Sequence, residues 1–196
     1  MQILVVDIET GTVDLDKDNW DIANCMICEV GIAELDTTTG SIAKVFDEIC
    51  QEQHGCHPDS WVFNNTDLTY AEVIESDYLS SYKATLQKIL DEDGYVTSWG
   101  HDFDLDRLEH KIRGFNIPNK FWDPKITLTE FMKIEGPYGY KWPSVQEVYV
   151  HFNPRQIWHQ NHRAIDDAVM EAELIYKSIV KWPELIDSWE KYLVAS

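Results

Sequence analysis

The chain opens with a short aliphatic run that is interrupted by two acidic residues at alternate positions. The run is Ile3–Val6, and Asp7, Ile8 and Glu9 follow it. Such a run, bounded by charge, predicts a buried strand that ends at the acids. Side chains two apart in a strand face the same side, so Asp7 and Glu9 project together while Ile8 turns toward the core. Two carboxylates this close repel each other unless a cation lies between them. The alternative interpretation is a solvated end of a strand.

Length and composition indicate one globular unit. The chain has 196 residues, of which 44% are hydrophobic and 12% aromatic, so a disordered chain is excluded. No apolar run reaches the roughly 18 residues that a membrane span needs. The first residues lack the basic start of a secretory signal. We therefore expect a single domain over residues 1–196 that is cytoplasmic and makes no contact with membranes.

The charge balance excludes proteins that wrap duplex DNA by electrostatic attraction alone. The chain has 16 basic and 35 acidic side chains, a formal net charge of −19, whereas such proteins present a basic face. A nucleic-acid partner must therefore be held by something else, such as bound cations or a short terminal segment.

The remaining elements follow from periodicity and turn residues. Strands are expected at 25–35, 41–49 and 95–99, and the first two form a hairpin across the turn residues Thr37–Gly40. Helices are expected at 70–74, 82–90, 104–113, 127–134, 143–152 and 163–179. This order predicts an α/β fold with a mixed sheet, an antiparallel hairpin plus parallel strands, flanked by helices.

A second group of acids follows the strand expected at 95–99. Asp102, Asp104 and Asp106 alternate at the start of the next helix. Open α/β sheets place their sites at this edge of the sheet. The alternative is that these acids cap the helix and interact with its dipole.

A third group lies where the last long helix begins. His162 precedes Asp166 and Asp167, and it can converge with Asp167 only from a loop before the helix. An ordinary capped helix start is the alternative. Taken together, the three groups suit two divalent cations held by carboxylates, with a histidine as general base for a water molecule.

The cysteines offer a competing metal site. Cys25 and Cys28 have the spacing of a zinc knuckle, which could be completed from residues 50–57. That stretch contains Cys50, His54, Cys56 and His57. Cys25 and Cys28 also fall in a predicted buried strand, where cysteine acts as a small hydrophobic residue, and the second half lacks paired-ligand spacing. We therefore favour buried thiols over a zinc site.

The order and spacing of the three acidic groups resemble a known family. Asp7-x-Glu9-Thr10, Phe103-Asp104-x₃-Leu108 and His162-x₄-Asp167-Ala168 are similar to the three motifs of the DnaQ-like, DEDDh 3′→5′ exonucleases. The resemblance runs from Ile3 to about Ile179. It implies a ribonuclease-H-like sheet and two-metal hydrolysis of the 3′-terminal phosphodiester, with release of nucleoside 5′-monophosphates.

The resemblance also implies a role for each matching residue. The acids that match its ligands for two divalent cations, Mg²⁺ or Mn²⁺, are Asp7, Glu9, Asp104 and Asp167. His162 matches the histidine that deprotonates the attacking water, and Thr10 matches a contact to the terminal nucleotide. Asp167 is chosen over Asp166 by the family spacing only. The family's His-Asn-x-x-Phe-Asp segment is shortened here, so Asp102 stays open as the middle acid.

The expected substrate is the 3′ end of single-stranded or short nucleic acid, with DNA favoured over RNA. The alternatives are an exoribonuclease or oligoribonuclease on the same site, and a binding module of this fold without catalysis. A homodimer and a polymerase or repair partner are left open. Trp61 and Phe63 are candidates either for stacking on a terminal base or for packing.

Overall fold

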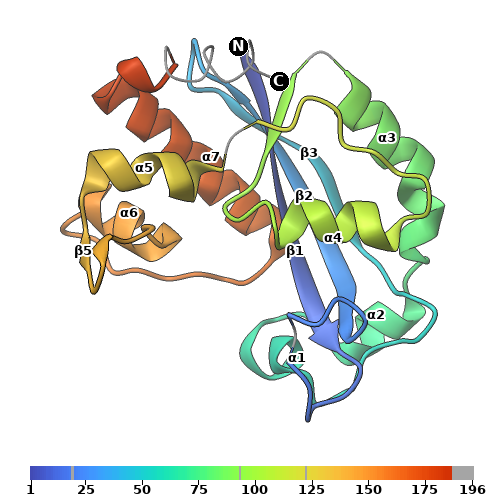
Figure 1. Cartoon of the computed structure of the whole chain (residues 1–196). Helices are drawn as coiled ribbons and strands as arrows, with labels where there is room; N and C mark the ends of the chain where they lie inside the picture. The colour runs from blue at the N-terminus through green and yellow to red at the C-terminus, as the bar shows by residue number, and fades with distance from the viewer. Residues whose placement is uncertain (19, 93, 122, 187–196) are drawn as a thin grey trace.

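The centre of the molecule is a four-stranded mixed sheet. The computed structural model describes residues 1–18, 20–92, 94–121 and 123–186. The strands β1 (Gln2–Thr12), β2 (Cys25–Asp36), β3 (Ile42–Ile49) and β4 (Tyr95–Thr97) lie in the order β3-β2-β1-β4 (Figure 1). The pairs β1–β2 and β2–β3 are antiparallel, whereas β1 and β4 are parallel. The predicted mixed sheet, with its hairpin across 37–40, is confirmed.

The first strand is longer than the sequence predicted. It continues past both acids to Thr12 because β2 pairs with it along its whole length, down to the pair Thr12–Cys25. The expectation that Asp7 and Glu9 mark the end of a strand was therefore wrong. The register shifts after Glu9, which leaves Cys28 as an extra residue in β2. Such a bulge bends and twists a strand pair, here directly beside the acids.

Alternate residues of β1 face two different helical layers. Leu4, Val6 and Ile8 pack with residues of α3 (Lys83–Asp91) and α4 (Asp104–Lys111). Ile3 and Val5 pack on the other side, against α5 (Pro124–Met132), α6 (Val145–Phe152) and α7 (Ala164–Lys181). Figure 1 shows these two layers on either side of the sheet. Asp7 and Glu9 continue the face of Ile3 and Val5, so they point toward α7.

Several elements differ from the sequence-based expectation at their ends. β4 stops at Thr97, and residues 119–121 run beside it, where the N–H of Phe121 donates to the carbonyl of Val96 at 2.6 Å. α5 begins earlier than expected because Asp123 caps it through the N–H of Lys125. Between the helices expected at 127–134 and 143–152 lies a small hairpin of two strands, β5 (Glu135–Gly136) and β6 (Gly139–Tyr140).

A third packed cluster lies under helices at one end of the sheet. It involves the unpredicted helix α1 (Trp61–Asn65), then α2 (Tyr70–Glu75), and the 3₁₀ turn η1 (Leu79–Tyr82) follows in the chain. Phe63 packs in this cluster, with its ring centroid 5.6 Å from that of Tyr70.

The four cysteines are buried free thiols, in keeping with the favoured interpretation. Cys28 and Cys56 lie next to each other, with 3.7 Å between their sulfur atoms. In the described part of the chain, no cysteine belongs to a group of side chains that could hold a metal ion. The same part of the chain contains no helix that is long and apolar enough to cross a membrane.

Candidate active site

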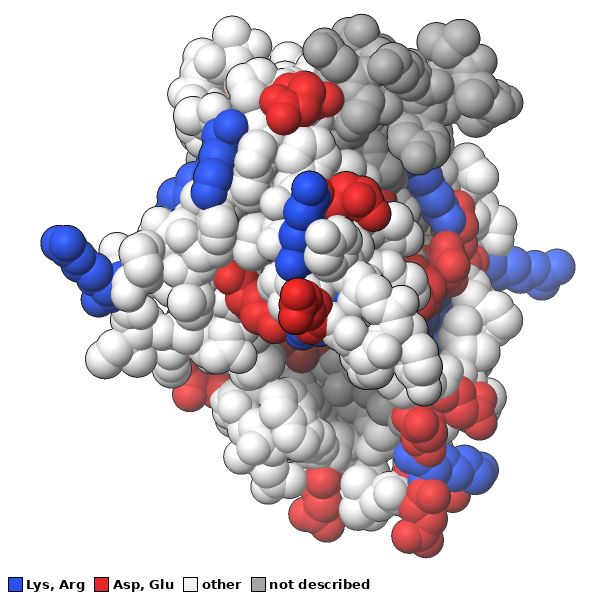
Figure 2. Space-filling model, turned by 60° about the vertical axis from the view of Figure 1, so that its left-hand side comes forward, with Lys and Arg blue, Asp and Glu red and all other residues white. Residues whose placement is uncertain are grey.

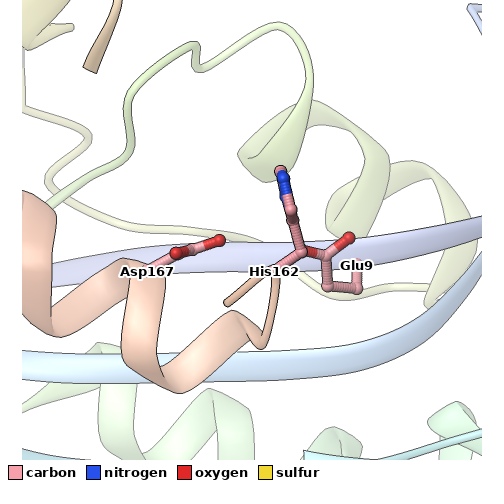
Figure 3. A group of neighbouring side chains, drawn as sticks. All are labelled: Glu9, His162 and Asp167. Atoms are coloured by element: carbon pink, nitrogen blue, oxygen red, sulfur yellow. The ribbon is translucent and has the colours of Figure 1, made fainter. Parts of the chain in front are cut away.

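Three predicted residues converge on one point above the sheet. Glu9 comes from β1, His162 from the loop before α7, and Asp167 from the first turn of α7 (Figure 3). One potential ligand atom from each lies within 4.8 Å of the others, and His162 Nδ1 is 3.8 Å from Glu9 Oε1. His162 has a φ of 50° and precedes the helix, as its convergence with Asp167 requires.

A buried carboxylate that the sequence analysis missed holds this loop in place. Glu29 on β2 is fully buried directly opposite Glu9 and accepts hydrogen bonds from Arg163 Nε at 2.8 Å and Nη2 at 2.6 Å. It also accepts the backbone N–H of Ala164, the first residue of α7, at 3.0 Å. One acid therefore fixes both the residue after His162 and the start of the helix. The available signal was an acidic residue with apolar neighbours on both sides in the middle of a predicted buried strand.

A glycine lets α7 approach the sheet at this point. A Cβ atom on Gly31 of β2 would lie 2.3 Å from the backbone of Ala164 and Ile165. Backbone contact this close is possible only without a side chain. Gly31 thus brings the first turn of α7, and with it Asp167, down onto β1 and β2.

The structure separates the two neighbouring acids at the start of α7. Asp167 is 2% exposed and accepts a hydrogen bond from Gln160 Nε2 at 2.8 Å. Asp166 points instead toward β3, where its carboxylate lies 2.9 Å from Lys44 Nζ. Only Asp167 therefore faces Glu9 and His162.

The middle acids are separated in the same way. Asp104 begins α4 and is 5% exposed, and its burial raises its pKa to about 7. Asp102 has a side chain that is 65% exposed and pairs with Lys125 at 3.3 Å. The pKa of Asp7 is raised by burial and then by the negative charge of Asp104. Asp7 and Asp104 lie beside the group of Glu9, His162 and Asp167 rather than within it.

A further buried acid, Glu171, faces the same group. It lies one helical turn after Asp167, is 4% exposed, and its Oε2 atom has no hydrogen-bond partner. Burial raises its pKa, and the charges of Asp104 and Asp167 raise it further. The four-residue spacing from Asp167 places both on one helix face and was the signal that the sequence analysis overlooked.

The electrostatics of the group fit a cation. Burial and the neighbouring Asp167 raise the pKa of Glu9 to about 9, and burial raises that of Asp167 to about 6. Buried carboxylates that hold protons near neutral pH are stabilised as anions when a divalent cation replaces those protons. The donors are carboxylate oxygens with one imidazole, a set that suits Mg²⁺ or Mn²⁺. The pKa of His162 is lowered by burial and then by His159, so its imidazole is neutral at pH 7 and can accept a proton.

A pocket adjoins the acids on the side of α1. Among its lining residues are Glu9, Thr10, Trp61, Asn64 and Phe103. The Trp61 side chain is 58% exposed, and its ring centroid lies 5.1 Å from that of His162. Trp61 and Phe63 were both candidates for stacking on a base or for packing. Trp61 lies at the site, whereas Phe63 packs against the third core cluster. Thr10 is 9% exposed and reaches the pocket wall.

Comparison with known proteins agrees with this geometry. Residues 4–175 match the family model RNase_T, described as exonuclease. The nuclease domain of 3'hExo, a DEDDh family member solved with bound rAMP, is similar with a TM-score of 0.71, 15% identity and coverage of 92% of both chains. A full-length 3'-exonuclease is similar with a TM-score of 0.70 and 15% identity over 92% of this chain, which spans 60% of that protein.

Exonuclease I of E. coli, solved with a dT13 oligonucleotide, gives a TM-score of 0.64 at 12% identity over 95% of this chain and 43% of that one. No curated protein sequence matches. The structural likenesses establish that these proteins share the fold of this chain, and the family model covers most of the chain. The chain therefore belongs to the RNase_T exonuclease family.

Proposed function

We propose that this chain is a divalent-metal-dependent exonuclease that removes nucleoside 5′-monophosphates from the 3′ ends of single-stranded or short nucleic acid, with DNA favoured. The observation that supports it is the convergence of Glu9, His162 and Asp167 above β1, with the half-buried Asp7 on the same strand face and the buried Asp104 at the start of α4. Every residue type that the reaction needs is present in one place. The cytoplasmic location and the domain extent of 1–196 are retained as predictions.

In this proposal Asp7, Glu9, Asp104 and Asp167 hold two cations. When bound, these cations supply Lewis-acid stabilisation of the negative charge that develops on the phosphate oxygens. The neutral imidazole of His162 accepts the proton of the attacking water. The Glu29–Arg163 ion pair and the hydrogen bond to Ala164 hold the adjoining backbone, so that the imidazole keeps its place next to Glu9.

The pocket beside α1 takes the terminal nucleoside. Its wall includes the exposed ring of Trp61, which can stack on a base, and the polar residues Thr10 and Asn64, which can hydrogen-bond to a sugar. The net charge of −19 repels a long polyanion, so we expect a distributive enzyme with weak affinity for long duplexes.

The experiment uses 5′-labelled single-stranded DNA and RNA of the same sequence, incubated with Mg²⁺, Mn²⁺ or EDTA. We expect a ladder that shortens from the 3′ end, requires metal, and is lost in Asp7→Ala and His162→Ala. Asp102→Ala and Asp166→Ala are matched controls, because both acids point away from the group, and they should retain activity. Faster shortening of RNA would reassign the substrate. Metal binding without any shortening would indicate a binding module and overturn the proposal.

A further inference from the structure

A small hairpin beside the site exposes more aromatic surface than folding requires. We call residues 135–142, with β5 and β6, the aromatic arm. Tyr138 at its tip is fully exposed, Tyr140 is 49% exposed and Trp142 is 62% exposed. The two strands are only two residues long, and neither Tyr138 nor Tyr140 packs with a core cluster of the described residues. Three rings in this position leave apolar surface in water, which is typical of a binding surface.

The base of the arm is anchored at the edge of the acid group. Trp99 Nε1 donates to the carbonyl of Pro143 at 3.2 Å, next to Trp142. Lys125 Nζ lies 5.3 Å from the centroid of the Trp142 ring and 3.3 Å from the carboxylate of Asp102, two residues before Asp104. Trp142 thus lies next to Lys125, which pairs with Asp102 in the segment just before α4. The arm lies on the side of α5 and α6, whereas the nucleoside pocket lies by α1 (Figure 1).

The charge of this region is opposite to that of the rest of the chain. Residues 124–163 contain five basic and three acidic side chains, a net charge of +2, and the remaining residues carry −21. Figure 2 brings this side of the molecule forward. Its left part is mostly uncharged, with basic side chains projecting at the edge, while acidic side chains gather at the lower right. The segment that carries the arm therefore repels a polyanion less than the rest of the chain does.

We propose that the aromatic arm stacks unpaired bases of the substrate strand on the 5′ side of the bond that is cleaved. This inference rests on the proposed function, because the terminal nucleoside then occupies the pocket beside Trp61 and the rest of the strand leaves past Lys125. Aromatic rings bind bases of any sequence, provided that the bases are unpaired. The arm thus selects single-stranded ends, and it offsets part of the repulsion from the acidic chain.

The inference predicts how binding depends on the length of the substrate. A dinucleotide reaches the pocket and the acids, whereas an octanucleotide also reaches the arm. Base stacking on one aromatic side chain changes affinity by about fivefold or more. We expect the ratio of KM for the dinucleotide to KM for the octanucleotide to be well above one in the wild-type protein.

The test compares Tyr138→Ala/Trp142→Ala with three other proteins. These are the wild type, Trp142→Phe, which keeps a ring, and Tyr78→Ala, which removes a half-exposed ring outside the arm, next to Asp77 in the sequence. Fluorescence anisotropy of an octanucleotide with an uncleavable 3′-terminal phosphorothioate linkage gives affinity independently of turnover. Melting curves of each variant report whether it is folded.

The double Ala variant should lose at least about tenfold in octanucleotide affinity and in the KM ratio, while Trp142→Phe and Tyr78→Ala stay within about twofold of wild type. An unchanged KM ratio in the double variant would overturn the role of the arm and leave the exonuclease proposal intact. Failure of the wild type to shorten any substrate would instead count against the proposed function itself.

Discussion

The ion pair of Glu29 and Arg163 gives the sharpest test of how the site is built. Glu29 is fully buried and accepts three hydrogen bonds, two from the guanidinium of Arg163 and one from the backbone of Ala164. In Arg163→Met the carboxylate keeps only the backbone bond and loses its counter-charge. Breaking a buried pair by removing one partner costs about 3–5 kcal/mol, so we expect a loss of that size in the free energy of unfolding. This is a large fraction of the total stability of a typical domain, about 5–15 kcal/mol.

The double variant Glu29→Gln/Arg163→Met separates stability from positioning. The Gln carbonyl can still accept the N–H of Ala164, and no buried charge remains, so most of the lost stability should return. The rate of oligonucleotide shortening should stay low, because nothing then ties the residue after His162 to β2. Urea unfolding measures the stability of each variant, and a single-turnover assay measures the rate at which it shortens the oligonucleotide.

Lys44→Met is the matched control, since Lys44 also pairs with α7 but through Asp166 at the surface, where about 1 kcal/mol or less is at stake. If Arg163→Met lowers the free energy of unfolding by no more than Lys44→Met does, the claim that the buried carboxylate of Glu29 needs its counter-charge is refuted. Full activity in the double variant would refute the claim that the ion pair positions His162.

Three further predictions concern the same region. Glu171→Gln keeps the shape of a buried acid but removes its charge, so calorimetric titration should show Mn²⁺ binding about tenfold weaker or more, and unchanged affinity would exclude Glu171 from the site. The pKa values of Glu9, Asp104 and Asp167 are raised to about 9, 7 and 6, so the metal-free native state holds protons that the unfolded chain has lost. Metal-free stability should therefore fall as the pH rises from about 5 to 9, and saturating Mg²⁺ should remove most of that slope, whereas stability that rises over this range would contradict the assignment. Gly31→Ala should lower the melting temperature by displacing α7, at a cost of about 1–3 kcal/mol or more, and an unchanged temperature would mean that the contact is not tight.

The part of the site that could be predicted is the part that depends on local geometry. Alternation along a strand correctly placed Asp7 and Glu9 on one face with Ile8 in the core. The irregular residues before α7 correctly placed His162 on a loop. Both inferences need only the periods of strands and helices, which the chain shows within a few residues.

The part that could not be predicted depends on contacts between distant segments. The sequence offered no physical reason to prefer Asp104 over Asp102, because the choice depends on which carboxyl Lys125 neutralises at the surface. Asp166 and Asp167 are separated by Lys44 on β3, more than a hundred residues earlier. The length of β1 was missed for the same reason, since its last residues are strand only because β2 pairs with them across a bulge.

These long-range contacts explain how a chain with a net charge of −19 can hold a group of buried acids. The acids that point away from the site form ion pairs, Asp166 with Lys44 and Asp102 with Lys125. Glu29, which is buried in β2, forms an ion pair with Arg163. What remains between β1, α4 and α7 is a set of carboxyls whose mutual repulsion and burial raise their pKa values. Repulsion left in a folded core is destabilising unless a ligand relieves it. The charges that make the metal-free protein less stable at high pH are therefore the same charges that make it bind divalent cations. In this molecule the pH dependence of stability and the affinity for cations both report on the carboxyls between β1, α4 and α7.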